Sequence, residues 1–321
     1  MDIKGYTYGY QAVRGVYNSP AGYESRRLLM ETGINWVCLA FSVKQEHFYS
    51  TEIKFDYRKN IPDLELISTI KDFHDNNIKV CLKPMIDTED GVWRALINFP
   101  DEAMNGEDYY WKKWFESYTA YLVHYADIAE YTGCEMFCLG CEMLASERKE
   151  ALWLETIREV KKHYHGLYTY NTNHGKEEKA AWYSELDYLG TSAYYPVAKG
   201  AGASLEEMKA EWEKIADHLE EVSKKLNKPI LFVEIGCRSA AGCAAMPWDF
   251  NHKDFPRSEE EQANFYEAAL SVMNKRDWFA GFFWWDWSPT IYNTKEEAST
   301  DTGFNTHLKK AEEVVKSWYA K

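Results

Sequence analysis

The feature that most limits the possible folds of this chain is an alternation of strand-like and helix-like segments along its whole length. Apolar segments of strand length are separated by longer segments whose apolar residues recur at helical spacing. The expected strands are residues 4–10, 35–41, 79–86, 135–143, 166–173, 187–195, 229–236 and 280–287. The expected helices are residues 62–77, 111–131, 204–226, 258–273 and 305–320. Eight strands, each followed by a helix, predict a (β/α)8 TIM barrel, an α/β fold formed as a single domain by residues 1–321.

A doubly wound open sheet is the alternative fold. Such a sheet usually has fewer strands, and a glycine-rich turn follows its first strand. The sequence "GYTYGYQA" at the first expected strand contains no such turn. The barrel is therefore favoured, and it predicts that catalytic groups lie at the C-terminal ends of the strands.

Charge and hydropathy argue against several classes of partner. The chain has 37 Lys and Arg against 51 Asp and Glu, a net charge of −14, which disfavours binding to nucleic acid or to an anionic membrane. No apolar run approaches the roughly 20 residues that a membrane span needs. The N-terminal sequence lacks the apolar core of a signal peptide, which favours a cytoplasmic protein unless a signal has been removed. We also expect a monomer.

The aromatic and cysteine contents each allow two interpretations. The 13 Trp and 23 Tyr residues suit stacking on sugar rings, although an aromatic-rich core explains them equally well. The seven cysteines are scattered and odd in number, which favours buried thiols over a disulfide framework. Cys138 and Cys141 have the spacing of a zinc half-site, but residues three apart in a strand point to opposite faces. We therefore expect no metal there.

Two of the expected strands end in a glutamate after an apolar run. Glu142 follows "MFCLGC" on the fourth strand, and Glu234 follows "ILFV" on the seventh. A carboxylate among apolar neighbours is costly to leave charged without a partner. One such glutamate could simply bond to the backbone or to an arginine. Two of them facing each other across a barrel form the carboxylate pair that glycoside hydrolysis uses.

Four stretches, in this order, carry a resemblance to a known family. They are "KPMIDTEDGVWR" (83–94), "CLGCEM" (138–143), "GTSAYYP" (190–196) and "FVEIG" (232–236). With them the chain resembles glycoside hydrolase family 113, the β-mannanases, which belongs to the retaining clan A. The resemblance implies a retaining endo-β-1,4-mannanase that acts on β-mannan or mannooligosaccharides and needs no metal or organic cofactor.

The resemblance also implies the roles of the catalytic residues. Glu142 would be the general acid/base and Glu234 the nucleophile. Tyr194 would donate a hydrogen bond to the nucleophile, with Tyr195 as the neighbouring candidate.

Further residues are expected to contact the sugar. Trp284 would form the floor of the site at the cleavage point, with Trp285 and Trp287 as competitors. Trp248, on the long loop after the seventh strand, is a candidate from its position. The remaining expected contacts, on the loop after the third strand, are Asp90, Trp93 and Arg94.

Several positions depart from the pattern of the family and its clan. Cys141 stands where many clan A enzymes have an asparagine, Met85 where a histidine is expected, and His174 where an aromatic is expected. The arginine that is common near the end of the second strand is missing. These departures leave open a clan A glycosidase acting on another β-glycan, or an exo-acting β-mannosidase. A catalytically silent sugar-binding barrel is the alternative from another class, but it would need no nucleophile.

Overall fold

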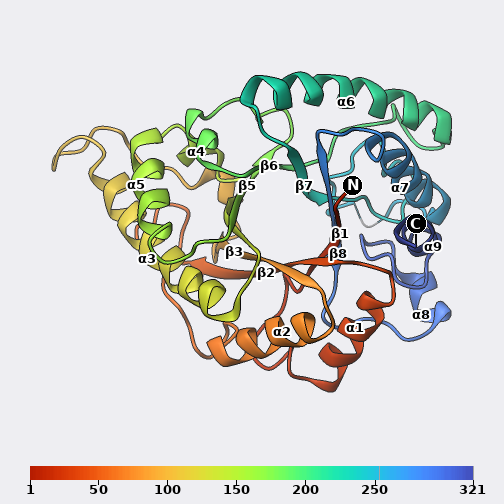
Figure 1. Ribbon diagram of the computed structural model, residues 1–321, viewed down its shortest axis with the longest axis horizontal. Helices are drawn as coiled ribbons and strands as arrows, with labels where there is room; N and C mark the ends of the chain where they lie inside the picture. The colour runs from red at the N-terminus through yellow and green to blue at the C-terminus, as the bar shows by residue number, and fades with distance from the viewer. Residues whose placement is uncertain (253, 321) are drawn as a thin grey trace.

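All eight expected strands are present in the computed structural model, which describes residues 1–252 and 254–320. Each strand pairs in parallel with the next, and β8 pairs with β1, so that the sheet closes (Figure 1). The predicted barrel is therefore confirmed. The strands are β1 (Ile3–Tyr8), β2 (Trp36–Gln45), β3 (Lys79–Thr88), β4 (Met136–Cys141), β5 (Leu167–Asn173), β6 (Tyr188–Ser192), β7 (Ile230–Ile235) and β8 (Phe279–Trp287).

Helices form a ring outside the strands (Figure 1). They are α1 (Pro20–Met30), α2 (Asp63–Asp75), α3 (Tyr109–Thr132), α4 (Leu144–Glu147), α5 (Glu150–Val160), α6 (Leu205–Leu226), α7 (Glu259–Met273), α8 (Lys295–Thr300) and α9 (Lys310–Tyr319), with short 3-10 helices η1 (Arg94–Leu96) and η2 (Ala181–Glu185). The expectation of a helix after every strand is wrong for β5, because in the described chain only η2 separates it from β6. Within the residues that the structure describes, no helix is long and apolar enough to cross a bilayer.

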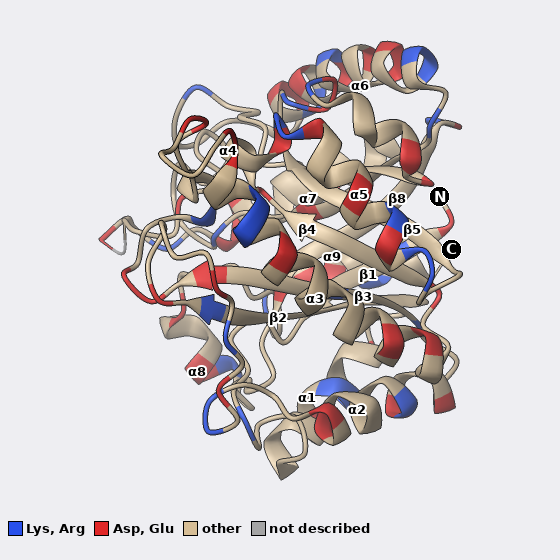
Figure 2. Cartoon of the chain, turned by 90° about the vertical axis from the view of Figure 1, so that its left-hand side faces the viewer, with Lys and Arg blue, Asp and Glu red and all other residues tan. Residues whose placement is uncertain are grey.

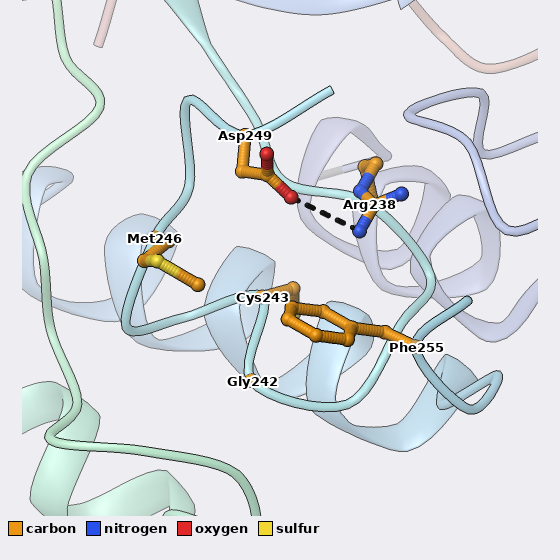
Figure 3. A pocket seen from close by; sticks show the side chains of 6 residues that line it. All are labelled: Arg238, Gly242, Cys243, Met246, Asp249 and Phe255. Carbon is orange, nitrogen blue, oxygen red and sulfur yellow. Dashed lines mark hydrogen bonds and ion pairs between the residues drawn. The ribbon is translucent and has the colours of Figure 1, made fainter. Parts of the chain in front are cut away.

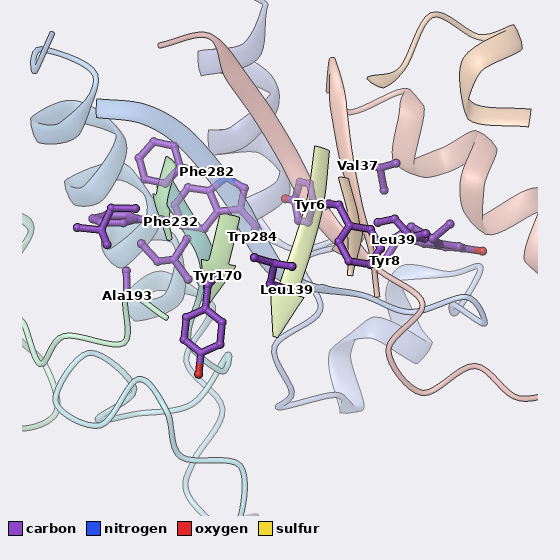
Figure 4. Packing of buried hydrophobic residues seen from close by; sticks show 14 of the residues in the cluster. Tyr6, Tyr8, Val37, Leu39, Leu139, Tyr170, Ala193, Phe232, Phe282 and Trp284 are labelled. Atoms are coloured by element: carbon purple, nitrogen blue, oxygen red, sulfur yellow. The ribbon is translucent and has the colours of Figure 1, made fainter. Parts of the chain in front are cut away.

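The apolar side chains form two separate regions. A small cluster fills the inside of the barrel and includes Cys38, Cys81, Cys138, Val233 and Phe283. A much larger cluster lies between the strands and the helices, and Figure 4 shows part of it. Because side chains alternate between the two faces of a strand, this division shows which residues point into the barrel.

A β-bulge in β4 interrupts this alternation just before Glu142. The pairing with β5 shifts register between Cys138 and Cys141. Both cysteines consequently point inward, so the expectation that they lie on opposite faces is wrong. Gly140 faces outward, where an added Cβ would lie 2.8 Å from the Tyr118 hydroxyl. The extra residue in the bulge therefore re-aims the end of the strand towards the barrel mouth.

The mouth of the barrel lies on the side away from both chain termini. Figure 2 shows the N- and C-termini at one end of the barrel, and α4 and α8, which follow β4 and β8, at the other. The C-terminal ends of the strands and the loops that follow them therefore surround one face.

Candidate active site

Glu142 is held at the mouth by groups from β5 and from the loop that follows β3. Its φ of 54° lies in the left-handed region, and its amide donates to Asn171 O at 2.7 Å. Its Oε2 accepts from Arg94 Nη1 at 3.2 Å and from Trp93 Nε1 at 3.4 Å. Its Oε1 accepts from Asn173 Nδ2 at 3.0 Å. The backbone bond and three side-chain donors fix the direction of this carboxyl group.

Glu234 lies deeper and is only 4% exposed. The β7–β8 pairing shifts register between Phe232 and Ile235, which lets Glu234 face the interior. Its Oε2 accepts from the Tyr194 hydroxyl at 3.1 Å, as the sequence had predicted for that tyrosine. Its other oxygen is bonded by three donors: Lys83 Nζ, Asn171 Nδ2 at 3.0 Å and Cys141 Sγ at 3.3 Å.

The two carboxyl groups therefore lie in different electrostatic environments. Burial, together with the nearby charge of Glu234, raises the pKa of Glu142, although Arg94 opposes the shift. Glu234 instead faces a cation. Burial and the negative charge of Glu234 raise the pKa of Tyr194 well above its usual range, so the Tyr194 hydroxyl remains a hydrogen-bond donor. A carboxyl group with a raised pKa beside one that is paired with a buried lysine is the division of environments that acid and nucleophile require.

Lys83 on β3 is a functional residue that the sequence reasoning missed. Its side chain is fully buried and forms an ion pair with Glu234. Burial alone would lower the pKa of Lys83, yet this pKa is raised well above its normal value. Burial raises the pKa of the nearby Cys141 thiol and keeps it neutral. The negative charge that raises the pKa of Lys83 is therefore that of Glu234. Alternation along β3 would have revealed it, since Lys83 shares the inner face with Cys81 and Met85.

We expect Lys83→Met to lower kcat/KM by about 100-fold, because the nucleophile loses the cation that stabilises its charge. The control is Lys309→Met, which removes another buried lysine from an ion pair, 2.7 Å long, with the partly exposed Asp301. The control should lose stability on heating but keep most of its kcat/KM, and an equal loss of kcat/KM in the two variants would contradict the role of Lys83.

The loop after β3 organises the acid/base rather than lying free at the mouth. Arg94 is bound on its other edge by Asp87, at 2.8 Å, and by the Tyr10 hydroxyl, at 3.0 Å. Trp93 remains 47% exposed beside Glu142, where a ligand can reach its ring. Asp90 accepts backbone hydrogen bonds from Phe48 and Val92, both at 3.0 Å. Its expected contact with the sugar stays a prediction, and its observed contacts shape the loop.

The expected role of Trp284 as the sugar floor is wrong. Trp284 is fully buried outside the barrel, where its ring stacks on Tyr266 of α7 at 4.1 Å and on Phe282 at 4.8 Å (Figure 4). The next residue, Trp285, points the other way and is partly exposed. Its ring lies 4.9 Å from that of Tyr10 and 5.8 Å from Lys83 Nζ, beside the nucleophile. Trp285 is therefore the aromatic residue of β8 available to a sugar at the cleavage point.

We expect the two neighbouring tryptophans to respond differently to substitution. Trp285→Ala should lower kcat/KM by roughly 10- to 150-fold, the equivalent of about 1.5–3 kcal/mol of lost apolar contact, with little change in stability. Trp284→Ala should cost about 3–5 kcal/mol of stability through the cavity it leaves. Steady-state kinetics and urea unfolding of both variants test this, and the reverse pattern would restore Trp284 to the site.

The other aromatic candidates also divide into residues that point away from the site and one that lies at its mouth. Tyr195 faces outward and donates to buried Glu177, and Trp287 donates to Ser25 Oγ at 3.1 Å. Trp248 is 45% exposed, and its ring lies 5.9 Å from that of His174, which follows β5. It therefore remains a candidate at the mouth.

An ion pair between two largely buried side chains fixes the loop that carries Trp248. Figure 3 shows Arg238 and Asp249 joined across it, with an N–O distance of 3.2 Å and both side chains at most 10% exposed. Cys237 and Cys243 also meet there with their sulfurs 3.2 Å apart, and all seven cysteines of the chain are free and buried.

Two further polar groups at the site were missed. Asn171 and Asn173 lie two residues apart on β5 and share its inner face, so one amide reaches Glu234 and the other Glu142. Among the described residues no three His, Cys, Asp or Glu side chains are grouped to hold a metal ion. The side chains assembled here can move a proton and supply a nucleophile.

Comparison with known proteins agrees with this geometry. A family model described as Glycoside Hydrolase Family 113 matches residues 6–309. A GH113 β-mannanase from Alicyclobacillus acidocaldarius, solved in complex with ManMIm, shares 38% identity over 99% of this chain and 97% of its own, with a TM-score of 0.90. A GH113 β-1,4-mannanase shares 36% identity over all of both chains, with a TM-score of 0.91.

More distant structures share the fold alone. A β-glucuronidase from Ruminococcus gnavus is 14% identical, with a TM-score of 0.65, and the match covers 99% of this chain but 50% of that one. Among curated proteins no match is found.

Proposed function

Because the chain belongs to glycoside hydrolase family 113, we propose that it hydrolyses internal β-1,4 bonds of mannan or mannooligosaccharides by double displacement. The membership makes it a glycoside hydrolase. The substrate is proposed from the relatives, which are described as β-mannanases and share 36–38% identity over nearly the full chain. The retaining course and the roles of individual residues are proposed from the site.

The first step forms a glycosyl-enzyme. Glu234 Oε attacks the anomeric carbon from below the sugar while the bond to the leaving oxygen breaks. Glu142 gives its proton to that oxygen, so that the shortened chain leaves as a neutral alcohol. Tyr194 and Asn171 hold the attacking carboxylate in place, and Trp285 supports the sugar ring.

The second step releases the product. Glu142, now ionised, takes a proton from a water molecule that attacks the same carbon, and Glu234 departs as a carboxylate. Two inversions at one carbon leave the product with the configuration of the substrate. Lys83 stabilises Glu234 whenever it is charged, both before the attack and after the release.

The observation that best supports this proposal is the unequal environment of the two glutamates. Glu234 is paired with a buried lysine, whereas Glu142 is held by neutral donors and one arginine and has a raised pKa. A sugar-binding protein without catalysis would gain nothing from a carboxyl group of raised pKa beside a second one that is paired with a buried lysine.

The experiment that tests the proposal measures both products and their configuration. The wild-type protein should cleave linear β-1,4-mannan and mannopentaose faster than β-1,4-galactan or carboxymethylcellulose, and NMR should show the β-anomer first. Release of mixed short oligomers from mannan would indicate endo cleavage, and release of single mannose units would indicate exo cleavage. A wild-type protein inert on every substrate would overturn the function, and an initial α-anomer would overturn double displacement.

A further inference from the structure

A groove of about 530 Å³ lies beside the active site on the segment that follows β8. Its wall begins at Ser288, directly after the strand, and continues through α8 to Asn305. Figure 2 places α8 at the mouth end of the barrel, and Figure 1 places it next to α9 on the outer ring. The volume lies within the range of small-molecule sites, and none of the proposed catalytic steps uses this groove.

The groove is connected to the catalytic residues on two sides. On one side Asp286, two residues before Ser288, lies within the electrostatic influence of both Glu234 and Asp301 of the groove wall. On the other side the ring of Phe304, next to Asn305, is 6.4 Å from the ring of Tyr194. A chain bound at the cleavage point and extending towards β8 would therefore reach this groove.

The charged groups of the groove already have partners. Asp301 accepts from Lys309 Nζ at 2.7 Å and from Gly303 N at 2.8 Å. Glu297 closes the capping box of α8 with Thr294. No Lys or Arg belongs to the described lining. Because its carboxylates are engaged and it offers no cation, the groove favours a neutral ligand over a phosphate or an acidic sugar.

The uncharged groups of the groove, in contrast, are available. In the described part of the chain the hydroxyl of Thr290 and the side-chain amide of Asn293 have no hydrogen-bond partner, and the Nδ2 group of Asn305 has none either. Tyr292 and Ile291 add apolar surface next to them. Uncommitted hydroxyl and amide groups beside an aromatic ring are the complement of a sugar, which has hydroxyls on its rim and C–H groups on its faces.

We propose that this groove is a sugar-binding position for a distant unit of the same glycan chain that is cleaved between Glu142 and Glu234. It rests on the proposed function, because a long neutral glycan must be the substrate. A unit bound there adds affinity for long chains and contributes nothing to a substrate too short to reach it.

The test compares long and short substrates. The probes are mannopentaose, which is long enough to extend beyond the cleavage point, and 2,4-dinitrophenyl β-mannoside, which is too short to do so. In the double variant Thr290→Ala/Asn293→Ala, kcat/KM on mannopentaose should fall about tenfold, the effect of one or two lost hydrogen bonds. The rate on the aryl mannoside should be unchanged. His124→Ala, at an exposed site on α3, is the matched control and should resemble the wild type on both.

Each outcome decides between the possibilities. A selective loss on mannopentaose supports the groove as a sugar position. An unchanged rate on mannopentaose, or an equal loss on both substrates, overturns it, because a distant position must act on the long substrate alone. A wild-type protein inert on mannopentaose would instead count against the mannanase function. Thermal unfolding of the double variant, measured before the rates are compared, confirms that its fold is intact.

Discussion

Glu234→Gln should abolish hydrolysis of mannooligosaccharides, with kcat falling by about 10⁴- to 10⁶-fold, because an amide cannot form the glycosyl-enzyme. The same change should also destabilise the protein. It leaves Lys83 charged, fully buried and without its counter-ion, a loss of the order of 3–5 kcal/mol. Kinetics on mannopentaose and urea unfolding at neutral pH measure the two effects separately.

A double variant shows whether the lost stability comes from this ion pair. Lys83→Met/Glu234→Gln removes both charges together, so it should be more stable than Glu234→Gln alone while remaining inactive. If the double variant were no more stable, the ion pair would not be the source of the loss. Appreciable activity in Glu234→Gln would contradict its assignment as the nucleophile.

Glu142→Gln should slow a substrate whose leaving oxygen must be protonated more than one whose leaving group departs as an anion. Hydrolysis of mannopentaose should fall by about 10²- to 10⁴-fold, because its leaving oxygen must be protonated. The glycosyl-enzyme should still form from 2,4-dinitrophenyl β-mannoside, whose leaving group departs as a stable anion. That intermediate should accumulate, because no base remains to activate water, and a burst of dinitrophenol followed by slow turnover would reveal it.

The matched control for this prediction is Arg94→Met, which keeps Glu142 but removes the charge beside it. Arg94 lowers the pKa of Glu142, so its loss should raise that pKa further and extend activity to higher pH. The acid form should then persist where it is lost in the wild type. If Glu142→Gln slowed both substrates equally with no burst, Glu142 would not be the acid/base.

The sequence predicted most of the fold because two simple periodicities run through it. Apolar runs of strand length alternate with helical patterns, and each of the eight expected strands was found within a few residues of its predicted bounds. The helix expected after β5 does not form, because that connection was assigned by analogy with the others and has no helical pattern of its own. The length and hydrophobic pattern of a segment predict whether it forms a strand or a helix. They do not predict the structure of the connection between two such elements.

The direction of individual side chains was harder to predict. Strict alternation along β8 cannot decide by itself whether Trp284 or Trp285 faces the interior, since shifting the register by one residue reverses the answer. The bulge in β4 adds the same difficulty, and it turns Cys141 inward against the simple pattern. Lys83 was overlooked because it lies in the middle of β3, away from the strand end where catalytic groups were expected. Asn171 and Asn173 do lie near the end of β5, but only the strands that end in a glutamate were assigned to the site.

Other expectations from the sequence stay predictions. The cytoplasmic location and the monomeric state rest on composition and on the N-terminal sequence. The sugar contacts of Asp90 and Trp248 rest on their positions near the mouth, and substrate kinetics of single variants would test them.

The register shifts before the two glutamates determine whether this active site can be rebuilt in another barrel. In β4 and β7 the catalytic carboxyl group reaches the interior because the strand departs from regular pairing one or two residues earlier. Deleting Gly140 would restore regular alternation and turn the end of the strand towards the helices without changing any catalytic side chain. Transplanting the activity to an idealised barrel therefore means copying the irregular strand ends, since a glutamate placed on a regular strand would sit at a different height and angle.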